Sequence, residues 1–223
     1  MGALIGATLP LAVGIAISPI PIIAAILMLL SPRARSTSVG FLLGWVLGIA
    51  AAVIVFTALS SILPASDPDA TRPIVGVIDI VLGVLLLLVA LRQWRGRPRA
   101  GEEPKLPAWM RAIDSMTAAR GFVLGLLLSA VNPKNLLLAV SAGLTVGSAG
   151  VGFWTIFVTL LVFVLIASCS VVVPVVAYLV ASNAMRRPLD ALRVWLSANN
   201  AVIMAVLMLV IGVVVIGKGI GQF

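Results

Sequence analysis

The sequence predicts an all-α polytopic membrane protein whose six transmembrane helices form an inverted repeat of three and three. Its 223 residues are 62% hydrophobic, with a mean hydropathy of +1.24, whereas soluble domains contain roughly 45–50% apolar residues. Only 10% of the residues are charged, and they lie between long apolar runs. Each half of the chain also has a proline-bearing polar break inside an apolar run. We therefore expect a single transmembrane domain over residues 1–223.

Six apolar runs are long enough to cross a bilayer, because a spanning helix needs about 20 residues. These runs cover residues of about 3–30, 38–62, 74–92, 119–146, 151–181 and 197–220. The first and fifth are longer than a bilayer requires and contain Pro19, Pro21 and Pro174, so we expect bends or local unwinding there. No basic residue precedes the first run, which predicts a mature helix rather than a cleaved signal peptide.

The basic residues predict the orientation of the six helices. Most of the Lys and Arg residues fall in the first, third and fifth loops, namely Arg33, Arg35, Arg92, Arg95, Arg97, Arg99, Lys105, Arg111, Arg120, Arg186, Arg187 and Arg193. Loops rich in Lys and Arg stay in the cytoplasm. The sequence therefore predicts cytoplasmic loops 1, 3 and 5, with both termini outside.

The two halves of the chain resemble one another around a linker of about residues 93–118. The first repeat covers about residues 1–92 and the second about 119–223. The first helix reads GIAISPIPIIAAILML and the fourth reads GLLLSAVNPKNLLLAV, so each has Gly, then Ser four residues later, then a proline break. Repeats of three helices must insert in opposite directions, and interrupted helices at matching positions are typical of transporter sites near the midplane.

The break in the fourth helix contains Asn132, Pro133, Lys134 and Asn135. Lys134 lies about 14 residues into this helix, which is about 21 Å of helix. A lysine at the bilayer centre costs about 2.5–3.5 kcal/mol and needs partners or water. We interpret the four residues as a substrate-binding or gating patch. The alternative is a plain kink, in which the Asn side chains cap broken helix ends.

The matching break in the first helix contains Ser18, Pro19 and Pro21, which we expect to face the Lys134 patch. Two prolines separated by one residue favour a non-helical turn, since neither can donate a backbone hydrogen bond. The helix N-terminus after such a turn favours an anion. A simple proline kink is the alternative.

Three further polar residues are candidates for ion coupling. Asp79 is the one acid predicted within a span, near the external end of the third helix, and Asn199 and Asn200 hold the mirrored position in the sixth. An ionisable group inside a membrane can carry a proton or pair with a cation. The alternatives are a hydrated interfacial acid and helix-capping amides.

Small residues recur every four positions in the second and fourth helices, at Gly40, Gly44 and Gly48 and at Gly121, Gly125 and Ser129. This spacing favours close helix packing, and it leaves homodimerisation through glycine-rich faces open. Tryptophans near the predicted helix ends are expected to be interfacial anchors. They are Trp45, Trp94, Trp154 and Trp195.

The motifs SPIPI (residues 18–22) and NPKN (132–135), with Asp79 and Asn200, resemble the LysE superfamily of exporters. Those proteins carry a Pro-x-Pro turn in the first helix and Asn-Pro-Lys in the matching one. Ile20 stands between the prolines, where amino-acid exporters usually have glycine. Residues 1–48 more closely resemble the GAP branch, the peptidoglycolipid-addressing proteins. That resemblance implies glycolipid translocation in the bacterial plasma membrane.

Composition excludes several functions. The chain has no His and one Cys, which excludes zinc sites of the usual kind and His-dependent catalysis. We expect no enzyme activity, cofactor, metal or nucleic-acid partner, and no phosphate-binding loop for ATP is present. Three functions stay open: export of an envelope glycolipid or related amphiphile, export of a small polar solute such as an amino acid or cation, and a non-transporting role in a larger lipid-export machinery.

Overall fold

The computed structural model describes residues 1–60, 73–97, 113 and 115–223, and this part of the chain is helical without strands. The predicted second loop and most of the predicted linker lie outside the described residues. The helices are α1 (Gly2–Ala16), α2 (Pro19–Leu30), α3 (Ala34–Ser60), α4 (Pro73–Arg95), α5 (Ala118–Ala130), α6 (Pro133–Gly147) and α7 (Phe153–Ile220).

The two predicted breaks are confirmed. Helices α1 and α2 meet at an angle of 51°, and α5 and α6 meet at 60°. Pro19 and Pro133 each occupy the first turn of the second helix in their pair. A proline is tolerated in the first turn, because the backbone N–H groups there have no acceptor within the helix, and it disfavours helical geometry in the residue before it. The preceding residues, Ser18 and Asn132, accordingly have extended backbone angles and cap the new helices.

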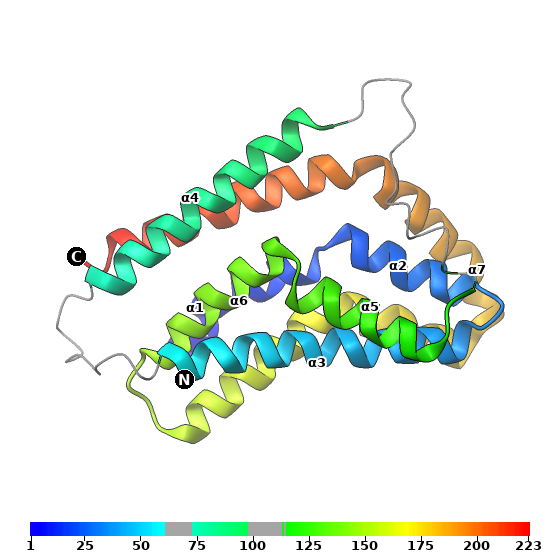
Figure 1. Cartoon of the computed structure of the whole chain (residues 1–223), viewed down its shortest axis with the longest axis horizontal. Helices are drawn as coiled ribbons and strands as arrows, with labels where there is room; N and C mark the ends of the chain where they lie inside the picture. The colour runs from blue at the N-terminus through cyan, green and yellow to red at the C-terminus, as the bar shows by residue number, and fades with distance from the viewer. Residues whose placement is uncertain (61–72, 98–112, 114) are drawn as a thin grey trace.

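Membrane-spanning length is reached by three single helices, α3, α4 and α7, and by the two bent pairs if each pair is one span. The 68 residues of α7 would extend about 100 Å, more than three times the hydrocarbon thickness. This helix turns back on itself, so that its C-terminal arm lies apart from its beginning (Figure 1). Its backbone is non-helical at Ala181.

The predicted fifth run ends at residue 181, where the backbone of α7 is non-helical, but the predicted fifth loop differs, because residues 182–196 are helical. This segment is amphipathic, although its several charged residues resemble those of a loop. Leu189 and Leu196 are buried, while Arg186 and Arg187 are not. Residues seven apart lie on one helix face, so this segment can pack against the protein and still present its basic side chains to water.

Helix α3 runs parallel to α5, because Gly40 meets Ala118 and Gly44 meets Phe122. A Cβ atom added at Gly44 would collide with the Phe122 carbonyl oxygen. The prediction that small residues bring helix backbones together is therefore confirmed for this pair. Trp45 lies beside this contact, fully buried and stacked on Phe41. Its predicted role as an interfacial anchor is wrong, whereas the side chains of the other three predicted anchors are exposed.

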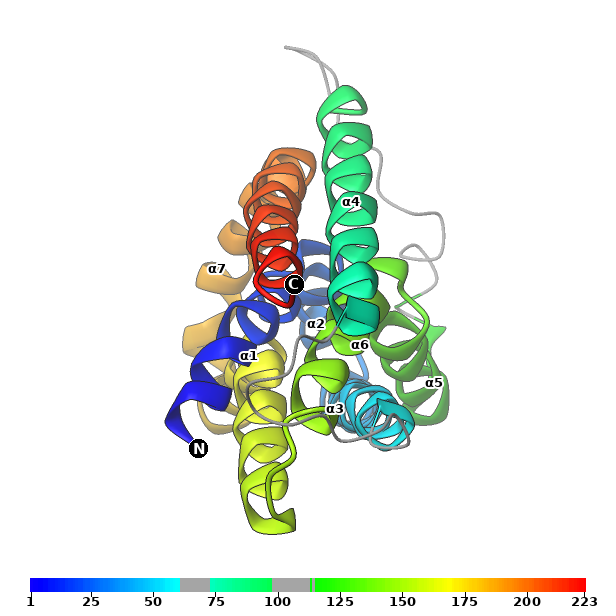
Figure 2. The same cartoon turned by 90° about the vertical axis from the view of Figure 1, so that its left-hand side faces the viewer.

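Helix α4 lies against the C-terminal arm of α7, and the two form a layer beside the remaining helices (Figures 1 and 2). They are antiparallel, since Gly76 meets Gly219 and Gly83 meets Gly212. In a second set of contacts, α3 packs on α5 and α6, while α7 packs on α1 and α2. The chain termini lie at one end of the molecule. The turn between α2 and α3 lies at the other end, with the start of α5 and the bend of α7 (Figure 1).

Candidate functional site

Lys134 joins the two broken helix pairs. Its Nζ atom donates a hydrogen bond of 2.7 Å to the Gly14 carbonyl oxygen and one of 2.5 Å to Ser18 Oγ. The Lys134 side chain is buried, with 3% of its surface exposed. The structure thus brings the predicted patches of the first and fourth helices together through an ammonium group.

The break in the first pair creates the acceptor for this ammonium. In an uninterrupted helix, the Gly14 carbonyl would accept from the backbone N–H of Ser18. That N–H instead bonds to the Ala16 carbonyl at 2.9 Å. The Gly14 carbonyl is therefore free for Lys134, and it lies in the last turn of α1, where the helix dipole favours a cation. Without the turn before Pro19, this partner would be occupied.

The break in the second pair is capped by its own asparagines. Asn132 Oδ1 accepts from the Lys134 backbone N–H at 3.1 Å, and Asn135 Nδ2 donates to the Leu128 carbonyl at 3.0 Å. The capping alternative is therefore correct for both amides. Asn135 has a second feature, since its Oδ1 atom is buried and has no hydrogen-bond partner among the described residues. A buried acceptor without a partner lowers the stability of the fold. A ligand that donates a hydrogen bond to this atom would remove that penalty.

No acidic side chain among the described residues forms an ion pair with Lys134. In the part of the chain that the structure describes, the ion pair is Arg193–Asp190 on the surface. Lys134 has three donor hydrogens, and two of them go to neutral oxygens. The arrangement suits an anionic group, which would accept the third hydrogen and balance the charge.

A second polar cluster lies further along α6. Asp79 of α4 is buried and accepts from Ser141 Oγ at 3.4 Å, while Lys218 Nζ of α7 donates to Thr145 Oγ1 at 2.5 Å. Asp79 and Lys218 also interact electrostatically. We call these four residues the Asp79 cluster. The sequence analysis missed Ser141, Thr145 and Lys218, although the spacing of four residues between Ser141 and Thr145 places both on one face of α6.

The remaining predicted site residues are not part of either group. Pro19 and Pro21 are buried in α2 and shape the turn. Asn199 Nδ2 bonds back to the Trp195 carbonyl at 2.9 Å, and Asn200 Oδ1 is buried without a partner in the described structure. Because α7 continues through both amides, they are not helix caps. No three His, Cys, Asp or Glu side chains of the described chain lie close enough to hold a metal ion.

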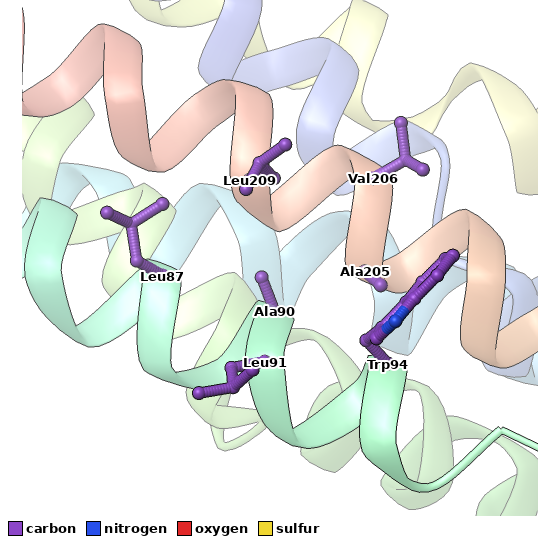
Figure 3. A pocket seen from close by; sticks show the side chains of 7 residues that line it. All are labelled: Leu87, Ala90, Leu91, Trp94, Ala205, Val206 and Leu209. Atoms are coloured by element: carbon purple, nitrogen blue, oxygen red, sulfur yellow. The ribbon is translucent and has the colours of Figure 1, made fainter.

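Two apolar grooves flank α4. The groove between α4 and α7 has a volume of about 350 Å³ and is lined by side chains such as Leu87, Leu91 and Trp94 (Figure 3). The groove between α4 and α6 has a volume of about 410 Å³ and extends from Arg92 to Pro133. The second groove therefore connects a basic residue near the end of α4 with the break in the fourth span.

Removing the Asn135 side chain tests the cap. Asn135→Ala leaves the partly buried Leu128 carbonyl without its donor, which is expected to lower the free energy of unfolding by about 1 kcal/mol. Asn199→Ala is the matched control, because the Asn199 amide donates to an exposed carbonyl. Its removal leaves no buried group without a hydrogen-bond partner. Thermal unfolding of both purified variants in one detergent measures the difference. Equal melting temperatures for the two variants would contradict the capping role.

Comparison with known protein families places most of the chain in a family. The model of a family described as Sap, sulfolipid-1-addressing protein, matches residues 8–221. This match begins within α1 and covers the junctions of both broken helix pairs, the Asp79 cluster and all of α7. Comparison with curated proteins and with solved structures gives no match.

Proposed function

The chain belongs to the Sap, sulfolipid-1-addressing protein family, and on this basis we propose that it exports a sulfated or otherwise anionic glycolipid across the bacterial plasma membrane. The observation that carries the proposal is the buried Lys134 ammonium, held by neutral oxygens at the junction of two broken helices. The family match supports involvement in lipid export. Placement within the LysE superfamily and its GAP branch stays a prediction.

We propose six membrane crossings in an inverted repeat, with the two arms of α7 as the fifth and sixth. The packing pattern supports this, because α3 lies on the α5–α6 pair as α7 lies on the α1–α2 pair. The parallel pair of α3 with α5 and the antiparallel pair of α4 with α7 both agree with this topology. The cytoplasmic side is proposed to be the end with the α2–α3 turn and the α7 bend, where Arg33, Arg35, Arg186 and Arg187 lie.

The headgroup is proposed to bind between the two breaks. A sulfate oxygen would accept from the third Lys134 hydrogen in a charge-assisted hydrogen bond. A sugar hydroxyl would donate to the unpaired Asn135 Oδ1 atom. In this structure the protein encloses the ammonium. Binding therefore requires the α1–α2 and α5–α6 pairs to separate, and the short bonds to Gly14 and Ser18 close the site when no headgroup is present.

The acyl chains are proposed to remain in the membrane, alongside α4. Both grooves beside α4 are apolar, and the one between α4 and α6 reaches Pro133, the residue before Lys134. A lipid can thus place its headgroup between the breaks while its chains lie in a groove of a few hundred cubic ångströms. A small polar solute has no apolar chains to fill these lateral grooves, which favours an amphiphile as the substrate.

A non-transporting role beside a larger lipid-export machinery is the second candidate. The observation that favours it is the enclosure of Lys134, since a closed ammonium could serve to lock the two halves together. Under this alternative, residues on the exposed surface would matter for export and the Lys134 side chain would not.

Removal of the gene in the native cell tests the proposed function. We expect sulfated glycolipid to disappear from the cell surface while its total cellular amount stays the same, because synthesis precedes export. Surface extraction followed by mass spectrometry of lipids measures both quantities, and a plasmid copy of the gene should restore the surface pool. An unchanged surface pool, or a fall in the total pool alone, would count against a role in export.

A further inference from the structure

The Asp79 cluster is a buried acid–base site at the opposite end of α6 from Pro133. Asp79 has 2% of its surface exposed, and the hydrogen bond that it accepts from Ser141 Oγ is long at 3.4 Å. Lys218 points at Thr145 rather than forming a close ion pair with Asp79, since no ion pair within 4 Å joins them. A buried carboxyl with so weak a hydrogen bond can bind a proton, because few partners stabilise its charged form.

Close backbone packing fixes the two charged residues at one depth. Gly76 meets the Gly219 backbone and Gly83 meets the Gly212 backbone, so the antiparallel helices α4 and α7 approach closely on both sides of Asp79. Asp79 and Lys218 therefore lie within about one helical turn of each other along the membrane normal. Lys218 and Thr145 are partly exposed, which gives the buried carboxyl a polar connection toward the surface at this end of the molecule.

We propose that Asp79 binds and releases the proton that drives lipid export, with Lys218, Ser141 and Thr145 completing the site. This inference rests on the proposed function and names its coupling ion. The carboxylate of Asp79 takes up one proton from the outer side and becomes a neutral carboxylic acid. The same proton later leaves to the cytoplasmic side, so that one proton enters as lipid moves outward and no other reactant is consumed.

A proton fits this cluster better than a metal cation does. The Lys218 ammonium attracts the ionised carboxylate of Asp79, and it would repel a second cation. Metal cations that prefer oxygen also need about six ligands, whereas one carboxylate and two hydroxyls are present here. Of the elements packed on α4, α7 contributes Lys218 near Asp79 and α6 contributes uncharged Ser141 and Thr145.

Helix α6 connects this cluster with the lipid site. Ser141 and Thr145 follow Lys134 by seven and eleven residues, so all three lie on one face of the helix. The ionised carboxylate of Asp79 accepts a hydrogen bond from Ser141 Oγ. When Asp79 is protonated, its O–H group can instead donate to Ser141 Oγ, which changes the contact between α4 and α6. A shift of α6 would in turn pull Lys134 away from Gly14 and Ser18. Proton binding at one end of α6 thereby opens the headgroup site at the other.

Reconstituted vesicles test the coupling. Wild-type protein in phosphatidylcholine vesicles is given a fluorescent sulfogalactosylceramide, and chemical quenching of the outer leaflet reports its transfer. A pH gradient is expected to accelerate transfer toward the acidic side several-fold in the wild type. Asp79→Asn is expected to move the probe at the same rate with and without the gradient. Asp190→Asn is the matched control, because this exposed acid pairs with Arg193 on the surface, and it should keep the acceleration.

A gradient response in Asp79→Asn equal to that of the wild type would overturn the inference while leaving lipid export intact. If wild-type vesicles move no probe, the proposed function fails and infrared spectroscopy decides the proton site by itself. The wild type is expected to show a protonated-carboxyl band that titrates with pH, shifts in frequency in Lys218→Gln and is absent in Asp79→Asn. The lack of any such titrating band in the wild type would also overturn the inference.

Discussion

Replacement of Lys134 by methionine is expected to reduce surface export of sulfated glycolipid at least about ten-fold. Methionine keeps an unbranched apolar chain but removes the charge that meets the headgroup. A hydrogen bond to a charged group contributes about 1.5–3 kcal/mol, and each 1.4 kcal/mol is a factor of ten in binding. The measurement is the surface lipid pool of cells that carry the variant as their only copy, with membrane protein levels determined by immunoblot.

Ser18→Ala is the control for this variant. It removes one neutral partner of the ammonium but leaves the Gly14 carbonyl and the charge in place, so export is expected to fall much less. Normal surface lipid in Lys134→Met, at a normal protein level, would contradict the lipid site and favour the non-transporting role. A loss of export that merely parallels a loss of protein would show a structural role for Lys134, which also contradicts the proposal.

Gly44→Ala is expected to destabilise the protein strongly for so small a change. The added methyl group would collide with the Phe122 carbonyl oxygen of α5, and neither backbone can move without separating the two packed helices. Overpacking of this kind costs about 1–3 kcal/mol in the free energy of unfolding. Thermal unfolding of the purified variant in detergent should therefore show a melting temperature lower by several degrees.

Gly217→Ala is the matched control, since a Cβ atom at Gly217 meets nothing within 4 Å. Alanine is better than glycine in a helix by about 1 kcal/mol, so this variant should melt at the wild-type temperature or slightly above. The opposite changes in melting temperature that we expect for the two variants distinguish the effect of packing from that of helix propensity. If both alanine variants melt alike, the close contact between α3 and α5 does not contribute to stability.

The sequence predicted the breaks at Pro19 and Pro133, where a new helix begins beside polar residues that need partners in any membrane fold. Proline alone is not sufficient for a break, because α7 continues through Pro174, where a bend was expected, and its non-helical residue is Ala181. The contact between the breaks followed from the expected symmetry of the two halves. The particular bonds of Lys134 to Gly14 and Ser18 did not, because they depend on which carbonyl the turn sets free.

Other features could not be predicted because they depend on tertiary packing. The segment of residues 182–196 looks like a charged loop, yet it is helical, since burial of Leu189 and Leu196 outweighs the helix-breaking tendency of Pro188. Trp45 looks like an interfacial residue from its position, but the close approach of α3 and α5 encloses it. Lys218 lies near the C-terminal end of the sequence, and the packing of α7 on α4 is what places it near Asp79.

Direct measurement of lipid binding tests the central claim, that the junction of the two broken helices receives an anionic headgroup at Lys134. Native mass spectrometry of the purified protein, incubated with sulfogalactosylceramide, counts the lipid molecules retained after the detergent is removed. The wild type is predicted to retain the sulfated lipid in preference to uncharged galactosylceramide, and Lys134→Met is predicted to lose that preference. Equal preference for the sulfated lipid in the wild type and Lys134→Met would contradict the claim.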